Sequence, residues 1–177
     1  MKYLTGLLLI LVALVFAQSC ESNKRANNYN NKVLVDDGGM LFLKNGTEAS
    51  LATVKASGLA ISNSKNQKVI QFAKTMIDDH TLLADNFRKL EIDNFVTSND
   101  TINAGHQQVI AALEQKKAAD FDKAYMEMLI NQHEQEITLF KSASLNKNPN
   151  VSDFASKNMA SLQAHLDSAK VIMLVLK

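Results

Sequence analysis

The chain has 177 residues, of which 46% are apolar, and its formal net charge is +1. This composition suits one domain with a sizeable core, and it excludes the strongly basic surface of an electrostatic nucleic-acid binder. Proline occurs once, glycine six times and tryptophan never, and so few helix breakers favour helices over strands. We therefore predict an all-α protein without a nucleic-acid partner.

The N-terminus is typical of the signal peptide of a bacterial lipoprotein. Lys2 supplies a positive charge, an almost unbroken apolar run follows over residues 4–17, and the small residues Ala17 and Ser19 precede Cys20. The run is too short for a comfortable membrane span. The segment resembles a lipobox, in which the thiol of Cys20 takes a diacylglyceryl group. We predict a signal peptide over residues 1–19 and lipidation of Cys20.

Residues 20–34 are predicted to be the lipidated cysteine and a polar tether. The segment is rich in asparagine and poor in apolar residues, so it cannot bury enough surface to order itself. The expected location is the bacterial cell envelope, at the outer membrane or its periplasmic face, with the membrane as partner through acyl chains. Protein partners and oligomeric state stay open. Cys20 is the only cysteine, which excludes an intrachain disulfide and a CxxC redox pair.

Residues 35–177 are predicted to form one helical domain. Apolar residues recur at helical spacing in five stretches: about residues 39–59, 67–90, 102–117, 121–144, and a fifth from residue 150 or 152 onward. Leu41, Ala52 and Leu59 are expected on the core side of the first helix, and Val109 on that of the third. Four long helices and one short helix predict a four-helix bundle with an additional short helix.

The histidines lie on or beside these apolar stripes. His80, His106 and His165 fall on core-facing sides, and His133 falls nearer an edge. Glu48 is a further polar residue on a core-facing side. Because burying such groups unpaired costs a few kcal/mol each, we expect them to meet partners inside the bundle.

We predict one polar cluster in the bundle core, with two competing interpretations. One is a transition-metal site for copper, zinc or iron, and the other is a structural polar network that fixes the register of the helices. The cluster is predicted to contain Glu48, His80, His133, Glu136 and His165. Asp79, His106 and Met76 are predicted to support this cluster. Met76 is included because it lies one turn before His80 and because soft sulfur suits copper.

A ferroxidase-type di-iron centre is not expected. It needs a Glu-x-x-His pair on each of two helices, whereas Ile77 and Leu162 stand three residues before His80 and His165. There is also no P-loop, no dinucleotide-binding turn and no nucleophile elbow. We therefore predict no catalytic residue, and we favour a non-enzymatic protein over an enzyme.

Five segments in chain order carry a family resemblance: residues 46–49 with Glu48, residues 75–80, residues 121–125, His133 with Ile137 and Phe140, and residues 162–166. Together they resemble the domain of unknown function 4142 family, found in exported or envelope proteins of bacteria. The resemblance covers roughly residues 35–171 and implies a ferritin-like helical bundle, here preceded by the signal peptide and flexible tether.

The resemblance implies no established reaction, because the biochemical role of the family is unsettled. Two functions are therefore expected. The first is an envelope-anchored, non-enzymatic binding or stress-related module. The alternative is a metal-binding protein that uses the histidine and glutamate cluster.

Overall fold

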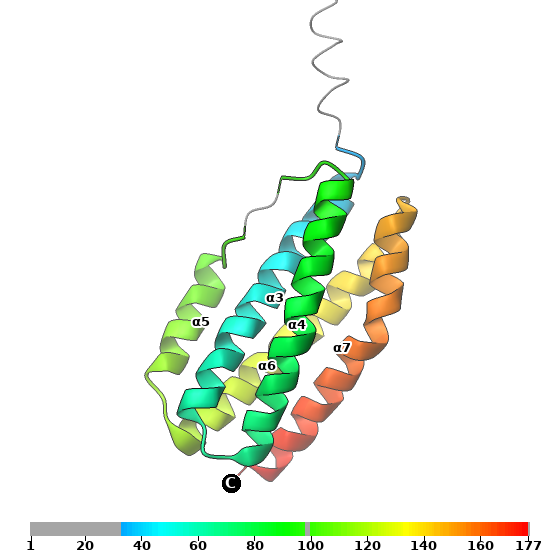
Figure 1. The fold of residues 1–177 in the computed structure, drawn as a ribbon. Helices are drawn as coiled ribbons and strands as arrows, with labels where there is room; N and C mark the ends of the chain where they lie inside the picture. The colour runs from blue at the N-terminus through cyan, green and yellow to red at the C-terminus, as the bar shows by residue number, and fades with distance from the viewer. Residues whose placement is uncertain (1–32, 98–99, 177) are drawn as a thin grey trace, which may run out of the picture. The chain divides into compact units, whose positions relative to one another are not determined.

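The computed structural model describes residues 33–97 and 100–176, which are helical apart from the connecting segments. Four long helices, α3 (Asp37–Asn63), α4 (Gln67–Asp93), α6 (Ala118–Ala143) and α7 (Pro149–Val175), form a bundle with the short α5 (Ala104–Glu114) (Figure 1). No strand occurs in this part of the chain, so the predicted all-α fold is confirmed. The predicted signal peptide, Cys20 and most of the tether lie outside the described residues.

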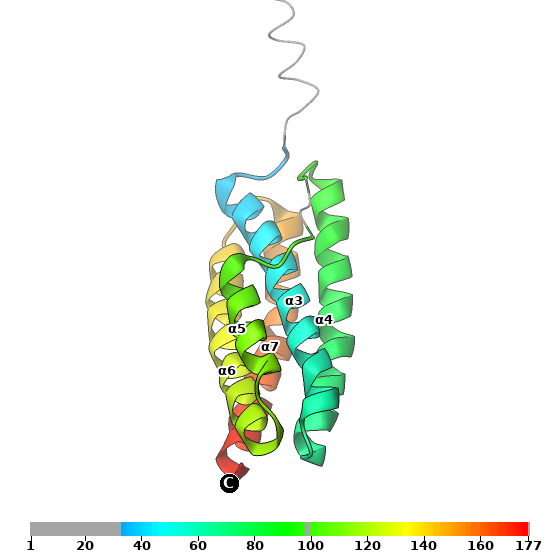
Figure 2. The same cartoon turned by 90° about the vertical axis from the view of Figure 1, so that its left-hand side faces the viewer.

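The order of the helices gives the bundle one long crossover. α3 pairs with α4 and α6 pairs with α7, and each pair is antiparallel. α4 and α6 run in the same direction, because the connection between them returns along the length of the bundle and contains α5 (Figure 2). This connectivity is the one found in ferritin-like bundles. α5 packs on α3 and α6.

Side-chain caps fix the starts of four helices. The carboxylate of Asp36 accepts a hydrogen bond of 2.7 Å from the N–H of Gly39 at the start of α3. Three asparagines play the same part for the other helices, Asn66 for α4, Asn103 for α5 and Asn148 for α7. Such caps satisfy N–H groups that have no partner within the helix. They place the starts of α5 and α7 within about two residues of those expected from apolar spacing.

Two residues expected to face the core are exposed instead. Leu41 on α3 is 57% exposed and Val109 on α5 is 41% exposed. α3 packs against both α4 and α6, so its buried face is broad and consists mostly of small residues that carry little apolar signal. On α5, Ile110 and Leu113 face the bundle; Ile110 follows Val109 directly and points about 100° away from it.

The core is divided between two ends of the bundle. At one end, four phenylalanines pack edge to face, with ring centroids as close as 4.9 Å: Phe42, Phe87, Phe140 and Phe154. At the other end, an apolar cluster surrounds Met76 and Tyr125. His80 and His133 each precede a phenylalanine of the first group by seven residues, or about two helical turns. They therefore lie between the two apolar regions.

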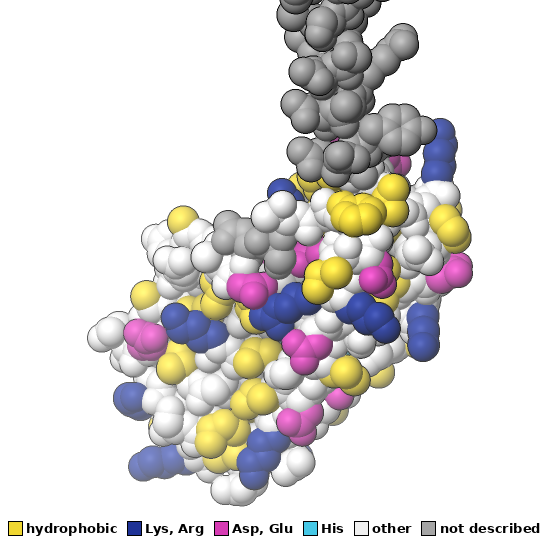
Figure 3. Space-filling model, turned by 45° about the horizontal axis from the view of Figure 1, so that its top comes forward, with side chains coloured by type: hydrophobic (Ala, Val, Ile, Leu, Met, Phe, Trp, Pro, Cys, Tyr) yellow, Lys and Arg dark blue, Asp and Glu magenta, His cyan; other side chains and the backbone are white. Residues whose placement is uncertain are grey.

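Acidic and basic side chains are interspersed on the face shown in Figure 3, without a block of either sign. This surface agrees with the small net charge of the chain. Among the residues that the structure describes, no helix is both long and apolar enough to cross a membrane.

Candidate functional site

Three buried histidines meet in the interior, each from a different helix. His80 comes from α4, His133 from α6 and His165 from α7. Each offers one ring nitrogen such that these atoms all lie within 4.8 Å of one another. The Nε2 atoms of His80 and His133 are 3.3 Å apart. No other group of three histidine, acidic or cysteine side chains in the described ranges comes this close.

Hydrogen bonds at the far side of two rings fix which nitrogens face inward. Nδ1 of His133 lies 2.8 Å from the carbonyl oxygen of Leu129, so it carries a proton and leaves a lone pair on Nε2. Nε2 of His165 lies 2.9 Å from the carboxylate of Asp79, so it donates there and leaves a lone pair on Nδ1. A carbonyl or carboxylate behind the ring is how proteins orient imidazole ligands of metal ions.

Burial keeps two of these rings neutral. It lowers the pKa of His80 well below its ordinary value, helped by the positive charges that His133 and His165 would carry. It also lowers the pKa of His133 to about 4, against a hydrogen bond to Leu129 that raises it. Neutral imidazole is the form that has a lone pair for a metal ion. The Nδ1 atoms of His80 and His165 are buried and have no hydrogen-bond partner within residues 33–97 and 100–176.

A small hollow between α4 and α7 is lined by two of the three histidines, His80 and His165. Its volume is about 40 Å³, and its lining includes Asp79, His80, Asn158, Ser161 and His165. The Asp79 side chain is 48% exposed, so the hollow is open on that side. Its size admits one or two water molecules. A metal ion bound here would be reachable from solvent.

The donor set suits particular metals. Three imidazoles with one open side form the ligand set of a four-coordinate zinc ion that keeps one position for water. Imidazole also suits copper, nickel and iron. The three histidines bring no bridging carboxylate into the group, so the donor set is not that of a di-iron carboxylate centre.

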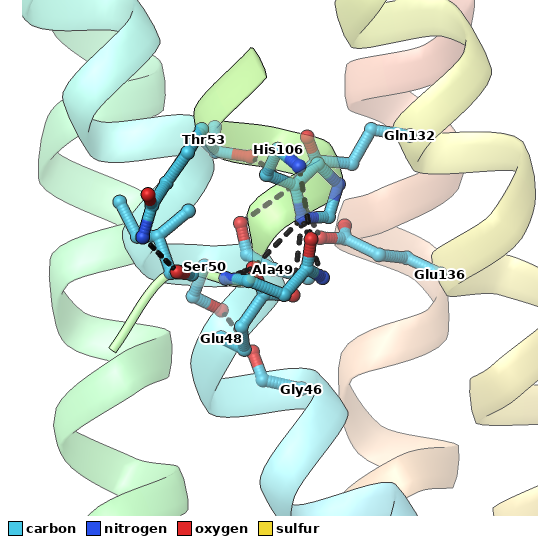
Figure 4. A network of polar contacts seen from close by, with 11 residues as sticks. Gly46, Glu48, Ala49, Ser50, Thr53, His106, Gln132 and Glu136 are labelled. Carbon is cyan, nitrogen blue, oxygen red and sulfur yellow. Dashed lines mark hydrogen bonds and ion pairs between the residues drawn. The ribbon is translucent and has the colours of Figure 1, made fainter. Parts of the chain in front are cut away.

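The residues expected to form one cluster are divided between two sites. Glu48 and Glu136 line a separate pocket between α3, α5 and α6, together with His106. Residues three apart on a helix differ by about 60° in direction, and those four apart by about 40°. On α6, His133 points toward α4 and α7. Glu136, three residues later, and Gln132, one turn before Glu136, point instead toward α3 and α5 (Figure 4).

Glu48 and His106 form an ion pair in the lining of this second pocket. Nδ1 of His106 lies 2.8 Å from Oε1 of Glu48, and the backbone N–H of Asn103 donates to the same oxygen at 2.8 Å. The hydrogen bond with Glu48 raises the pKa of His106. Burial alone would raise the pKa of Glu48, but the hydrogen bonds from His106 and Asn103 bring it below its ordinary value.

The supporting residues have different environments. Asp79 contacts His165 directly, as a supporting residue of the histidine site would, whereas Met76 belongs to the apolar core. Sequence reasoning missed Gln132 and the carbonyl of Leu129. Gln132 could have been found, because it stands one turn before Glu136 on the same face. A backbone carbonyl leaves no signal in the sequence.

A family model described as "Domain of unknown function (DUF4142)" matches residues 25–172. The matched range contains the three histidines and all residues of the second pocket. No curated protein and no solved structure matches the chain.

Proposed function

The chain belongs to the DUF4142 family, and we propose that it is an envelope-anchored lipoprotein whose bundle binds one zinc or copper ion through His80, His133 and His165. The observation that carries this proposal is the convergence of three ring nitrogens within 4.8 Å in the interior. The proposed anchor rests on the predicted signal peptide and on the single cysteine at position 20.

A purely structural network is a poorer account of the same geometry. In such a network each buried nitrogen would have a donor or an acceptor beside it. Here one proton can join His80 to His133, but Nδ1 of His165 has no partner among the described residues. An unsatisfied buried polar atom costs about 1–3 kcal/mol. A metal ion would bind the lone pair of Nδ1 of His165 together with those of the inward nitrogens of His80 and His133.

The proposed role is metal binding rather than catalysis. When bound, a zinc or copper ion would supply a Lewis-acidic centre beside the hollow between α4 and α7. Asp79 and the Leu129 carbonyl hold the rings of His165 and His133 in the orientation that a ligand needs. The acyl chains would keep this site at the membrane surface.

Metal titration of the full-length chain, purified in a non-ionic detergent and first stripped with a chelator, tests the proposal. We expect one zinc or copper ion per chain in competition with a metal-binding dye. At a free metal concentration of about 100 times Kd, the folded state should gain about 2.7 kcal/mol. His133→Ala should lose the stoichiometric ion, because it removes one of three ligands.

His106→Ala is the matched control, since it removes a histidine of the same bundle that lies outside the three-histidine site. It should bind metal as the wild type does. The proposal fails if the wild type melts at the same temperature with chelator, zinc and copper, or if the two histidine variants lose the ion equally.

A further inference from the structure

The pocket between α3, α5 and α6 is the larger of the two polar sites. Its volume is about 260 Å³. Figure 4 shows side chains of Glu48, His106, Gln132 and Glu136 directed toward one another from the three helices. The metal site does not include any of them, so the pocket needs an explanation of its own.

Two buried acceptor atoms in this pocket have no hydrogen-bond partner. They are Oε2 of Glu136 and Oε1 of Gln132. The orientation of the Gln132 amide is fixed, because its Nε2 donates to the carbonyl of Ala49 at 2.6 Å and to the hydroxyl of Thr53 at 2.7 Å. Glu136 is only 3% exposed. Both atoms therefore lack a hydrogen-bond donor among the residues that the structure describes.

The charge of the pocket favours a cationic donor. The lining contains two carboxylates, Glu48 and Glu136, and no lysine or arginine. His106 neutralises Glu48 through their ion pair, so Glu136, which is ionised above about pH 7, is the carboxylate that lacks a counter-charge. A charged group that donates hydrogen bonds would suit these two free acceptors.

The geometry selects among cations. Oε1 of Glu136 lies 3.3 Å from Nε2 of Gln132, so this amide stands beside one of the two carboxylate oxygens and disfavours the paired hydrogen bonds of a guanidinium. Glu48, His106 and Glu136 are not among the groups close enough to hold a metal ion in the described part of the chain. Ala49 and Leu139 add an apolar wall to the lining, against which a short carbon chain can pack.

We propose that this pocket binds a small organic ammonium ion, a primary amine with a short apolar chain, whose N–H groups donate to Glu136 and Gln132. The inference does not depend on the proposed metal site, because it rests on different residues. It adds a second ligand class to the bundle.

Saturation-transfer NMR with butylammonium as the probe tests this proposal. The experiment uses the full-length chain in a non-ionic detergent, with chelator present throughout so that the three-histidine site does not contribute. We expect saturable binding of butylammonium. 1-Butanol, which has the same carbon chain without the charge, should not bind.

Glu136→Gln should weaken butylammonium binding about tenfold or more, because a charge-assisted hydrogen bond is roughly twice as strong as a neutral one. Gln135→Lys is the second variant. It changes an exposed residue of the pocket lining and so leaves the core intact. The added positive charge should weaken butylammonium binding several-fold. Glu127→Gln, an exposed change on the same helix, is the control and should bind as the wild type does.

Three results would overturn the proposal. The first is equal binding of 1-butanol and butylammonium, and the second is tighter binding of guanidinium or calcium. The third is unchanged butylammonium affinity in both Glu136→Gln and Gln135→Lys. None of these results bears on metal binding by the histidines, so the two proposals fail separately.

Discussion

At the scale of single residues, Asp79 has the most specific role at the metal site. It accepts the Nε2 proton of His165 and so keeps the Nδ1 lone pair directed inward. Asp79→Asn should lower zinc or copper affinity about 10- to 100-fold, the usual cost of losing a hydrogen-bond partner of a metal ligand. Dye competition measures this. Asp78→Asn makes the same change at the exposed neighbouring position, and an equal loss in both variants would refute the assigned role.

Glu136 makes stability depend on pH. Burial raises its pKa from 4.5 to about 7, against the hydrogen bond from Gln132 and the charge of His106, which lower it. Between these values the folded state keeps a proton that the unfolded state has released. As pH rises from 4.5 to about 7, this carboxyl therefore lowers the free energy of unfolding more and more. Its full destabilising effect is present above about pH 7.

Glu136→Gln removes that cost. The variant should differ little from the wild type near pH 4.5 and should be more stable by about 3 kcal/mol at pH 8. Glu48 on α3 and His106 on α5 also face this carboxyl, but they are present in both proteins. Urea unfolding at the two pH values measures the difference. A variant that gains the same stability at both pH values would disprove the assignment.

The sequence predicted which polar residues are buried better than it predicted their grouping. Apolar spacing placed His80 and His165 on core sides, and both are buried. Glu136 and His133 belong to different sites because of how α6 is rotated about its own axis among the other four helices. A helical pattern gives directions within one helix, but it does not give the crossing angles that decide which residues of different helices meet.

At the scale of elements, the contact between α3 and α4 depends on Gly46. A Cβ at this position would overlap the ring of Phe87, whereas a Cβ at Gly58 on the same helix would meet open space. Gly46→Ala should therefore destabilise the bundle by about 1–3 kcal/mol through overpacking. Gly58→Ala should be neutral or stabilising by up to about 1 kcal/mol, because alanine favours helix.

Thermal melts of the two glycine variants test this contact. Both substitutions add one methyl group to α3, so intrinsic helix preference cannot explain a difference between them. Equal melting temperatures for the two variants would show that Phe87 does not press on Gly46 in solution.

Helix content was easier to predict than helix faces. All five helices were expected, because apolar side chains recur along each of them. The buried face of α3 was not, since glycine, alanine, serine and threonine make up most of it and contribute little to an apolar pattern. Close packing on two neighbours selects such small residues, and that condition is visible only once the neighbours are known.

At the scale of the whole molecule, the proposed lipid anchor sets where the bundle acts. Cells that express the full-length chain with labelled palmitate should incorporate label, and Cys20→Ser should not, because the only thiol of the chain is then absent. The substitution lies outside the helical unit of residues 34–177. Equal labelling of the two proteins would rule out lipidation at this cysteine.

The central claim is that the bundle holds a metal ion between three helices. Anomalous diffraction at the zinc absorption edge, from crystals of the zinc-loaded chain, tests it most directly. The account predicts one peak in the interior, at about 2.0–2.1 Å from a ring nitrogen of each of His80, His133 and His165. An interior without a peak at these histidines, or a peak found instead at Glu48 and His106, would contradict it.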